Sequence, residues 1–477
     1  MRLSYLRITF VTLAFLVCSS VLLAQFSGGS GTEADPFQVA TPNDLNNVRN
    51  YPTAHFIQTA DIDLWVAPYY IAEGWNPICT TQPFSGVYDG GGFSILYLYI
   101  SRTTQPTQGL FGKIENAQLR NITLQSFFFL CDSIAGGLVG ISESSLISGC
   151  TVSGEISGLS QDVGGIAGRL LSGSTMQDCR AIVELDGGDN CGILSGWANF
   201  SSITNCDAYG SVWAGNNSGG LVGDLVGSTI QECHADVDIT GWSAVGGLAG
   251  SAKLSSVISN CSAICNLTGT ASLGGLVGSL VSGAQIVNCY SASEFVFDGT
   301  IGGIAGFMNE GQITASYWNS DLVLNTVNPY GEARTTAQMT YPYDENTYIG
   351  WDFNEIWQPD TDHLINAGYP FLDYPWVSIP SDTAPALPFS LSCYPNPFKS
   401  QTNFEFELSK GGVPELGIYN LKGQLVKKYP SSYFPTGKST LTWNGLSDSG
   451  TELASGIYFL RMKVQGITHT QKLILMK

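Results

Sequence analysis

The sequence predicts an all-β protein in which a parallel β-helix, with three short strands in each coil, is followed by a small Ig-like β-sandwich. A short glycine-rich apolar block recurs every 27 or 28 residues from Gln108 to Gly306, without a helical period of 3.6 residues. Residues 389–477 instead hold about seven short alternating segments that turn residues separate. The 477 residues include 56 glycines and only 12% charged residues, which suits a β-protein with many turns.

The glycine block marks one corner of each coil. Glycines flank one or two aliphatic residues, as in Gly136–Gly140 and Gly274–Gly278. Paired glycines permit a positive φ and a close approach of stacked backbones, while the Leu or Ile beside them fills the interior. The general crossover rule favours a right-handed coil. The anchor glycines, spaced 28, 28, 27, 28, 27, 28 and 28 residues apart, are Gly109, Gly137, Gly165, Gly192, Gly220, Gly247, Gly275 and Gly303.

A second fixed feature is a bend followed by an alternating strand, as in Ile203–Cys206 and then Cys233–Ile239. The cysteine and the apolar residues after it share one parity, so they face inward together. Asn before the cysteine tolerates a left-handed backbone. We interpret the cysteines as a buried thiol column; the alternative is isolated disulfides, such as Cys261 with Cys265. The column comprises Cys150, Cys179, Cys206, Cys233, Cys261 and Cys289, with Tyr317 expected at that place in the last coil.

The chain divides into six predicted segments. They are a signal peptide at 1–24, an N-terminal cap of the β-helix at 25–107, the β-helix repeats at 108–320, a C-terminal cap or extension at 321–378, a Pro-rich linker at 379–388 and the C-terminal sandwich at 389–477.

The first segment has the parts of a secretory signal. Arg2 and Arg7 supply the positive end, an apolar run from Ile8 to Val17 follows, and cleavage is expected after Ala24. No other segment reaches the roughly 18 to 20 apolar residues of a membrane-spanning helix. The sequence therefore predicts an exported protein without a transmembrane segment in the mature chain.

The two caps are expected to cover the ends of the β-helix, where strand edges and apolar interior would otherwise be exposed. In the N-terminal cap, Thr41 is the expected N-cap of a short helix that begins at Pro42. An alternating strand is predicted for Phe93–Ile100. In the C-terminal cap, aromatic residues such as Trp351 and Trp357 are expected to close the open apolar end.

The repeats resemble the GLUG repeats of bacterial secreted and adhesin-like surface proteins. The resemblance rests on the Gly-Gly-Leu-Val-Gly blocks and the Ile-x-Asn-Cys steps, and it covers roughly residues 26–376. It implies a structural repeat in an adhesin-like protein. The matching motifs outside the repeats are Tyr88–Phe93, Ser316–Trp318, Thr335–Met339, Gly350–Phe353 and Gly368–Leu372.

Residues 389–477 resemble the C-terminal sorting domain, type A, of the type IX (Por) secretion system. This resemblance implies recognition at the outer membrane and then attachment to the cell surface or release. The partner that it implies is the type IX secretion machinery. The matching motifs are Tyr394–Phe398, Ile418–Gln424, Trp443–Gly445, Leu453–Phe459 and Lys472–Leu475.

The charge is uneven along the chain. Residues 25–388 carry 8 basic and 34 acidic side chains, a balance of −26, whereas residues 389–477 carry 10 basic and 5 acidic ones, a balance of +5. A body this acidic repels phosphates, which makes nucleic acid and anionic lipid poor partners, and no nucleic-acid partner is expected. No CxxC pair or histidine cluster indicates a metal site, and no cofactor is expected.

The outward positions of the strands are where a function could lie. Acids and aromatics there are compatible with a binding face for an extracellular polysaccharide or for a host or neighbouring cell surface. Outward polarity by itself favours the alternative, a solvated face that discourages strand pairing. The acids are scattered, so we expect an adhesin-like protein with no catalytic role. The other candidate function is a β-helix polysaccharide lyase or glycoside hydrolase. The predicted binding residues are Tyr209, Trp213, His234, Asp236, Asp238, Tyr290 and Glu294.

Overall fold

The structure is a computed structural model of the chain. The predicted signal peptide and the linker at 379–388 lie outside the residues that it describes. Those residues are 26–372 and 389–475, apart from gaps at 103, 133, 159–160, 297–300, 324–326, 329, 395–397, 409–411, 421–424, 431 and 465–466.

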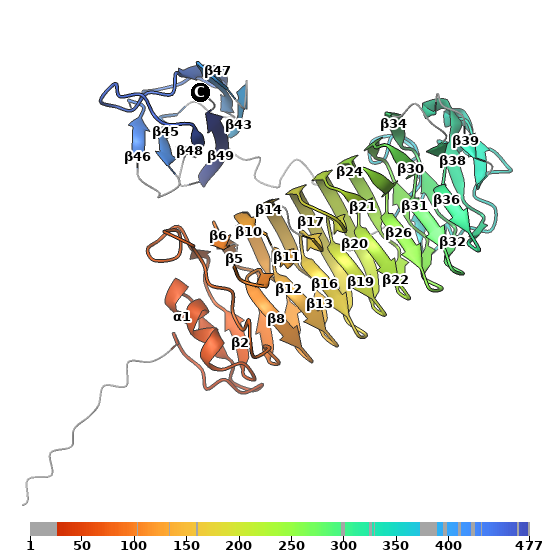
Figure 1. Cartoon of the computed structure of the whole chain (residues 1–477), viewed down its shortest axis with the longest axis horizontal. Coiled ribbons are helices and arrows are strands. Elements are labelled where there is room, and N and C mark those ends of the chain that lie inside the picture. Colours follow the sequence, from red (N-terminus) through yellow and green to blue (C-terminus); the bar gives the residue numbers. More distant parts are fainter. Residues whose placement is uncertain are drawn as a thin grey trace, which may run out of the picture.

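The prediction of an all-β chain with a parallel β-solenoid is confirmed. Figure 1 shows the coils stacked along the long axis of the solenoid, with α1 at one end of the stack. Each coil contributes to three parallel sheets of 8, 9 and 23 strands. In one coil these are β19 (Ser195–Asn199) in the first sheet, β20 (Ser202–Trp213) in the third and β21 (Asn216–Gly219) in the second.

The 8-stranded and 9-stranded sheets contain one short strand from each coil. The strands of the 8-stranded sheet are β8 (Phe111–Glu115), β12 (Val139–Glu143), β16 (Ala167–Leu171), β19, β22 (Val222–Val226), β26 (Ala249–Lys253), β31 (Val277–Val281) and β36 (Ala305–Asn309). Those of the 9-stranded sheet are β7 (Thr107–Gln108), β11 (Ile134–Gly136), β15 (Val163–Gly164), β18 (Cys191–Gly192), β21, β25 (Ser243–Gly246), β30 (Ala271–Gly274), β35 (Ile301–Gly302) and β39 (Val327–Asn328).

The third sheet carries the cysteine column on its inner side and the candidate binding residues on its outer side. Its pairings are parallel and in register, so that Cys179 pairs with Cys206. Its longer strands are β10 (Thr123–Cys131), β14 (Thr151–Ser157), β17 (Thr175–Asp186), β20 and β24 (His234–Thr240), continued by the shorter β28 (Ser262–Ala263), β29 (Asn266–Thr268), β33 (Tyr290–Ser291) and β34 (Glu294–Val296).

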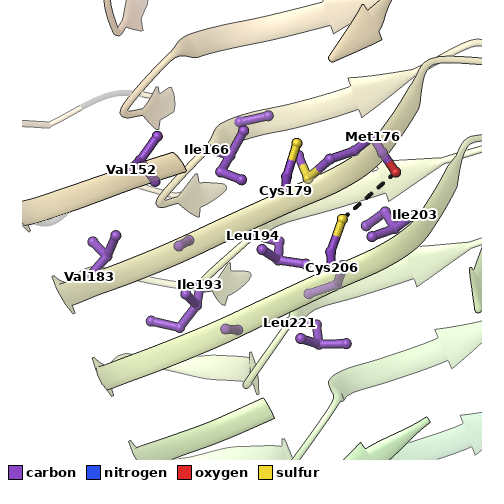
Figure 2. Packing of buried hydrophobic residues seen from close by; sticks show 14 of the residues in the cluster. Val152, Ile166, Met176, Cys179, Val183, Ile193, Leu194, Ile203, Cys206 and Leu221 are labelled. Atoms are coloured by element: carbon purple, nitrogen blue, oxygen red, sulfur yellow. Dashed lines mark hydrogen bonds between the residues drawn. The ribbon is translucent and has the colours of Figure 1, made fainter. Parts of the chain in front are cut away.

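The cysteine column lies in the core, as predicted. Figure 2 shows Cys179 and Cys206 side by side among aliphatic side chains, with Cys206 Sγ 3.9 Å from the carbonyl oxygen of Met176. The eleven cysteines among the described residues are free thiols, which rules out the Cys261–Cys265 disulfide in this structure. Burial raises the pKa of the Cys206 thiol well above its ordinary value, so the thiol is neutral and behaves as a small apolar side chain.

The residue before each cysteine has a left-handed backbone. Asn205, Asn260 and Asn288 have φ values of 51°, 52° and 52°. One prediction about this column is wrong: Ser316, not Tyr317, stands at the cysteine position of the last coil. The backbone N–H of Cys289 donates to Ser316 Oγ at 3.2 Å, and Tyr317 pairs with Tyr290.

Several block glycines are required by close approach and not by a positive φ. Gly220, Gly247 and Gly275 lie outside the left-handed region, but a Cβ on each would lie 2.1, 2.3 and 2.1 Å from the carbonyl oxygen of the glycine one coil further on. No side chain fits at such a distance. Each corner therefore packs backbone directly on backbone.

The N-terminal cap already contains coil strands. Helix α1 (Pro42–Asn47) begins after Thr41, whose side chain accepts a hydrogen bond from the Asp44 N–H, as predicted. Strands β1 (Phe37–Val39), β2 (His55–Gln58), β4 (Val87–Asp89) and β9 (Gln118–Arg120) pair in parallel order. The strand predicted for Phe93–Ile100 is divided into β5 (Ser94–Leu96) and β6 (Tyr99–Arg102), because Tyr97 between them has a φ of 60°.

From Thr336 onward the C-terminal extension packs on the outside of the last coils, which corrects the prediction that Trp351 and Trp357 close the open end of the interior. Trp318, Val323 and Tyr330 do pack on the interior core at that end. Strand β38 (Tyr317–Asn319) pairs with β40 (Glu332–Arg334), and α2 (Thr336–Met339) follows. A second core forms there, separate from the core inside the coils. Its buried residues are Tyr290, Ala292, Tyr317, Met339, Tyr348, Trp351, Trp357, Tyr369 and Leu372.

The C-terminal domain consists of two antiparallel sheets, with strands close to the seven predicted ones. They share a core that includes Phe404, Ile418, Trp443 and Leu460. One sheet orders β43 (Phe389–Tyr394), β44 (Thr402–Leu408) and β47 (Gly437–Trp443); the other orders β46 (Leu425–Lys428), β45 (Glu415–Asn420), β48 (Gly456–Val464) and β49 (Ile467–Leu475). Among the described residues, no helix is long and apolar enough to cross a membrane.

Candidate functional site

The outward side chains of the third sheet form columns that run along the solenoid. Because the register is kept from coil to coil, equivalent residues stack at about 4.8 Å, the spacing of neighbouring strands. The first column contains Arg180, Asp207, His234, Ser262 and Tyr290; the second contains Ile182, Tyr209 and Asp236; the third contains Glu155, Glu184, Ser211, Asp238, Asn266 and Glu294; the fourth contains Asp186, Trp213 and Thr240.

The predicted binding residues differ in their exposure: four are exposed, two are mostly buried and one, Tyr290, is fully buried. Trp213, Asp236, Asp238 and Glu294 are exposed on the second to fourth columns, whereas Tyr209 and His234 are mostly buried. Tyr290 is fully buried beneath the extension and is not part of an open surface. Its buried phenol instead donates to the carbonyl oxygen of Pro370 at 2.9 Å.

Two exposed indoles lie at one corner of neighbouring coils. Trp213 is 63% exposed and Trp242 is 68% exposed. Trp213 pairs with Thr240, and the backbone N–H of Trp242 donates to the carbonyl oxygen of Gly215 at 2.9 Å. Ser211, two residues before Trp213, pairs with Asp238, so Trp213 lies one column and one coil away from that carboxylate. Trp242 was not among the predicted residues, because it follows the alternating strand and its place emerges only from the stacking.

A pocket lies where the extension meets the outer face; we call it the roofed pocket. It is small, with a volume of about 70 Å³, and it is partly open to solvent. The solenoid supplies side chains of the first two columns, and the extension supplies a wall that is mainly apolar. The lining residues are Asp207, Tyr209, His234, Ser262, Ile365, Asn366, Phe371 and Leu372.

The charges in the roofed pocket are paired. Arg180 Nη2 lies 3.2 Å from Asp207 Oδ2, and the guanidinium carbon lies 5.2 Å from the centre of the Tyr209 ring. Nδ1 of His234 lies 2.8 Å from Ser262 Oγ. Burial, with a smaller contribution from the nearby Arg180 charge, lowers the pKa of His234 to about 4. The imidazole is therefore neutral at physiological pH.

The exposed carboxylates differ from one another. Partial burial, together with the charge of Asp238, raises the pKa of Asp236. Asp238 Oδ1 accepts a hydrogen bond of 2.7 Å from Asn266 Nδ2 on the next coil. Among the described residues, no group of three or more His, Cys, Asp or Glu side chains is placed to hold a metal ion.

Stability should depend on the protonation of His234. Because the pKa of His234 is lowered in the folded chain, the unfolded chain binds the proton first as the pH falls. The contribution of neutral His234 to the free energy of unfolding is therefore complete above about pH 6.5. As the pH falls toward 4, the free energy of unfolding decreases by at most about 3 kcal/mol. Urea unfolding from pH 7 to 4 should show a smaller loss in His234→Gln than in the unsubstituted protein. The exposed His363→Gln is the control, and equal losses in all three proteins would contradict the prediction.

The comparisons with known proteins support the sorting domain. Residues 392–476 match the family model described as "Secretion system C-terminal sorting domain". That segment is a type IX sorting domain. The matched segment coincides with the C-terminal domain of two antiparallel sheets. A type IX sorting domain indicates secretion to the cell surface or the extracellular space.

The chain also matches short parts of two curated relatives. One is described as "Putative Gly-rich membrane protein" of Evansella cellulosilytica, 36% identical over 122 residues, which are 24% of this chain and 14% of the relative. The other is Halomucin of Haloquadratum walsbyi, 32% identical over 170 residues, which are 33% of this chain and 2% of the relative. The chain therefore spans only a small part of the length of either relative.

Two solved structures are similar in part. The first is dimeric latent PorU from Porphyromonas gingivalis, with a TM-score of 0.16 and 17% identity; the match covers 22% of this chain and 10% of PorU. The second is an IgA1 protease, with a TM-score of 0.37 and 16% identity; the match covers 62% of this chain and 23% of the protease. The expectation that this chain has no catalytic role is wrong, because a protease is among these structures and catalysis is therefore not excluded. The likeness is too low to assign an activity.

Proposed function

We propose that this protein is exported through the type IX machinery by its sorting domain and binds extracellular glycans through the outer face of its solenoid. The observation that carries the proposal is the presence of two exposed indoles, Trp213 and Trp242, on the same neighbouring coils as the exposed carboxylates Asp236 and Asp238. Aromatic faces stack on the C–H faces of sugar rings, while carboxylates accept hydrogen bonds from hydroxyl groups. Exposed apolar side chains gathered at one place commonly mark a binding surface.

Removal of the two indoles should weaken glycan binding. The double substitution Trp213→Ala and Trp242→Ala should lower the affinity for the best glycan of an array at least tenfold, about 1.4 kcal/mol, because interface energy concentrates in aromatic anchors. Affinity is measured by calorimetry on the purified mature protein. The matched control is Phe200→Ala, which removes a 61% exposed ring from outside this face. Equal binding by the double variant and the control would overturn the proposal.

Deletion of residues 389–477 should stop export at the periplasm, because the segment that matches the sorting family is then absent. Cell fractionation and surface labelling measure this in a bacterium that has the type IX machinery. A carrier protein fused to residues 389–477 is the control, and it should reach the surface. Unchanged surface display of the truncated chain would contradict the assignment of export to this domain.

One observation favours a second candidate, a carbohydrate-active enzyme of the β-helix class. Asp236 and Asp238 are two residues apart on one face of β24, which places their Cα atoms about 7 Å apart. The raised pKa of Asp236 beside a second carboxylate is the pattern of an acid and base pair in glycoside hydrolysis. A reducing-sugar release assay on the bound glycan tests this, and loss of release in both Asp236→Asn and Asp238→Asn would support it.

A further inference from the structure

A hollow lies on the outer face of the four-stranded sheet of the sorting domain, over Gly417. Strands β46, β45 and β48 are neighbours in this sheet (Figure 1). Gly417 pairs with Lys428 on one side and with Arg461 on the other, so this row across the sheet has no side chain at its centre. The hollow has a volume of about 390 Å³ and is partly open to solvent. We call it the sorting-domain pocket.

Three cationic side chains line the pocket. Lys428 and Arg461 lie on either side of the central glycine, and Lys463 lies two residues further along β48. Among the described residues, no carboxylate forms an ion pair with any of these three side chains. The neighbouring Lys427 does have such a partner, since its Nζ lies 3.5 Å from Asp448 Oδ1. The three charges in the pocket are therefore available to a ligand.

Tyr419 adds a neutral hydrogen-bond donor to the pocket. A Cβ on Gly417 would lie 3.3 Å from the hydroxyl oxygen of Tyr419 and 2.8 Å from Cδ1 of Leu425. Both side chains therefore lean over the glycine from the next row of the sheet. The pocket thus combines N–H and O–H donors with a small apolar surface.

The charge of the pocket matches a phosphate monoester better than a carboxylate. Glu415, which pairs with Lys463, is the one acidic residue in the lining, so three positive charges and one negative charge give a balance of +2. A phosphate monoester carries about −1.5 to −2 at pH 7 and has three acceptor oxygens. The guanidinium of Arg461 can bind two of those oxygens at once. A carboxylate has one charge and would leave the pocket positive.

The sorting domain is also the part of the chain to which an anion is drawn. Residues 389–477 have a formal balance of +5, whereas residues 25–388 have a balance of −26. A phosphate is therefore attracted to this domain and repelled by the solenoid. The pocket is independent of the glycan-binding face on the solenoid.

We propose that the sorting-domain pocket binds a phosphate monoester, carried either by a soluble sugar phosphate or by the headgroup of a lipid. Arg461, Lys428 and Lys463 contact the phosphate oxygens, and the Tyr419 hydroxyl donates to the same group. Leu425 contacts the carbon part of the ligand. The inference goes beyond the proposed function, in which this domain serves export and the solenoid binds glycans.

The test is a calorimetric titration of residues 25–477 with glucose 1-phosphate at constant ionic strength. Saturable binding is expected with a Kd of about 1 mM or below. Glucuronate, a sugar with a carboxylate, should bind at least about tenfold more weakly. Arg461→Gln and Lys428→Gln should each weaken the binding of glucose 1-phosphate about tenfold, because each removes a charge-assisted hydrogen bond. The matched control is Lys427→Gln, outside the lining, which should bind within about twofold of the unsubstituted protein.

Vesicles distinguish the two sources of the phosphate. Co-sedimentation is measured with phosphatidylcholine vesicles that contain or lack phosphatidic acid. Sedimentation that requires phosphatidic acid and is lost in Arg461→Gln would assign the pocket to a lipid headgroup. Binding of glucose 1-phosphate without sedimentation would assign it to a soluble phosphate ester.

Three results would overturn the inference: no saturable binding of either phosphate probe, equal affinity for glucuronate and glucose 1-phosphate, or equal binding by the two pocket variants and Lys427→Gln. Lys428 is exposed, so its substitution leaves the core of the domain intact and reports on the site alone. Failure of the proposed function is distinguishable, because glycan binding is tested at Trp213 and Trp242 and export is tested by deletion of the whole domain.

Discussion

Gly247→Val should prevent the solenoid from folding. The Cβ of any side chain at this position would lie 2.3 Å from the carbonyl oxygen of Gly275 and 2.7 Å from Cβ of Ala263 on the next coil. Both neighbours are held by the stacking of coils, so neither can move without opening the corner. We expect a loss above about 4 kcal/mol, at the exceptional end for a single substitution. Urea unfolding followed by the β-sheet circular dichroism signal measures it.

Gly173→Asn is the control for this substitution. Gly173 has a φ of 84° and open space around its Cβ position, and Asn tolerates the left-handed region better than most residues. Its stability should change by about 1 kcal/mol or less. A Gly247→Val protein that unfolds at the same urea concentration as the control would show that the corners can separate, contrary to the close packing described here.

Tyr290→Ala should release the extension from the outer face. The substitution leaves a cavity among Tyr369, Trp351 and Trp357 and removes the hydrogen bonds to Asn366 and Pro370. Loss of a buried aromatic side chain costs about 3 to 5 kcal/mol. Because the extension has its own small core, this cost should fall on residues 336–372. Hydrogen exchange should show loss of protection there and retained protection in β20 and β24.

Tyr290→Phe is the matched variant, since it keeps the ring and removes only the hydroxyl. It should cost about 1 to 3 kcal/mol, the range for leaving a buried polar partner unsatisfied. The extension should then remain protected, though less than in the unsubstituted protein. Full protection of residues 336–372 in Tyr290→Ala would contradict the role of Tyr290 as their anchor.

The coil could be predicted from the sequence because its determinants are local and repeated. Alternate residues such as Cys206 and Ala208 point inward, and the same alternation recurs in every coil. Asn205 marks the bend through a preference of its own backbone. The repeat did not distinguish Ser316 from Tyr317 in the last coil, because both follow the bend at Ala315 and only the pairing of Tyr290 with Tyr317 decides the register.

The candidate site was predicted in part. Parity placed Tyr209, Trp213, His234, Asp236 and Asp238 on one side of the sheet, and the structure agrees. Parity could not indicate that Tyr290, on the same side, is covered. It also gave no reason to join Asn366 or Phe371 to His234, which lies more than a hundred residues earlier in the chain.

The sequence by itself therefore determined the period, the inward cysteine column, the left-handed bends and the sorting domain, since each is specified within one repeat or one motif. The tertiary structure decided where the extension lies, and with it which outward residues are open, which are buried and which form the roofed pocket. The physical reason is that the extension has no periodic pattern that fixes its position. Its place depends on the aromatic packing and hydrogen bonds that Tyr290 makes with residues about 60 to 80 positions away.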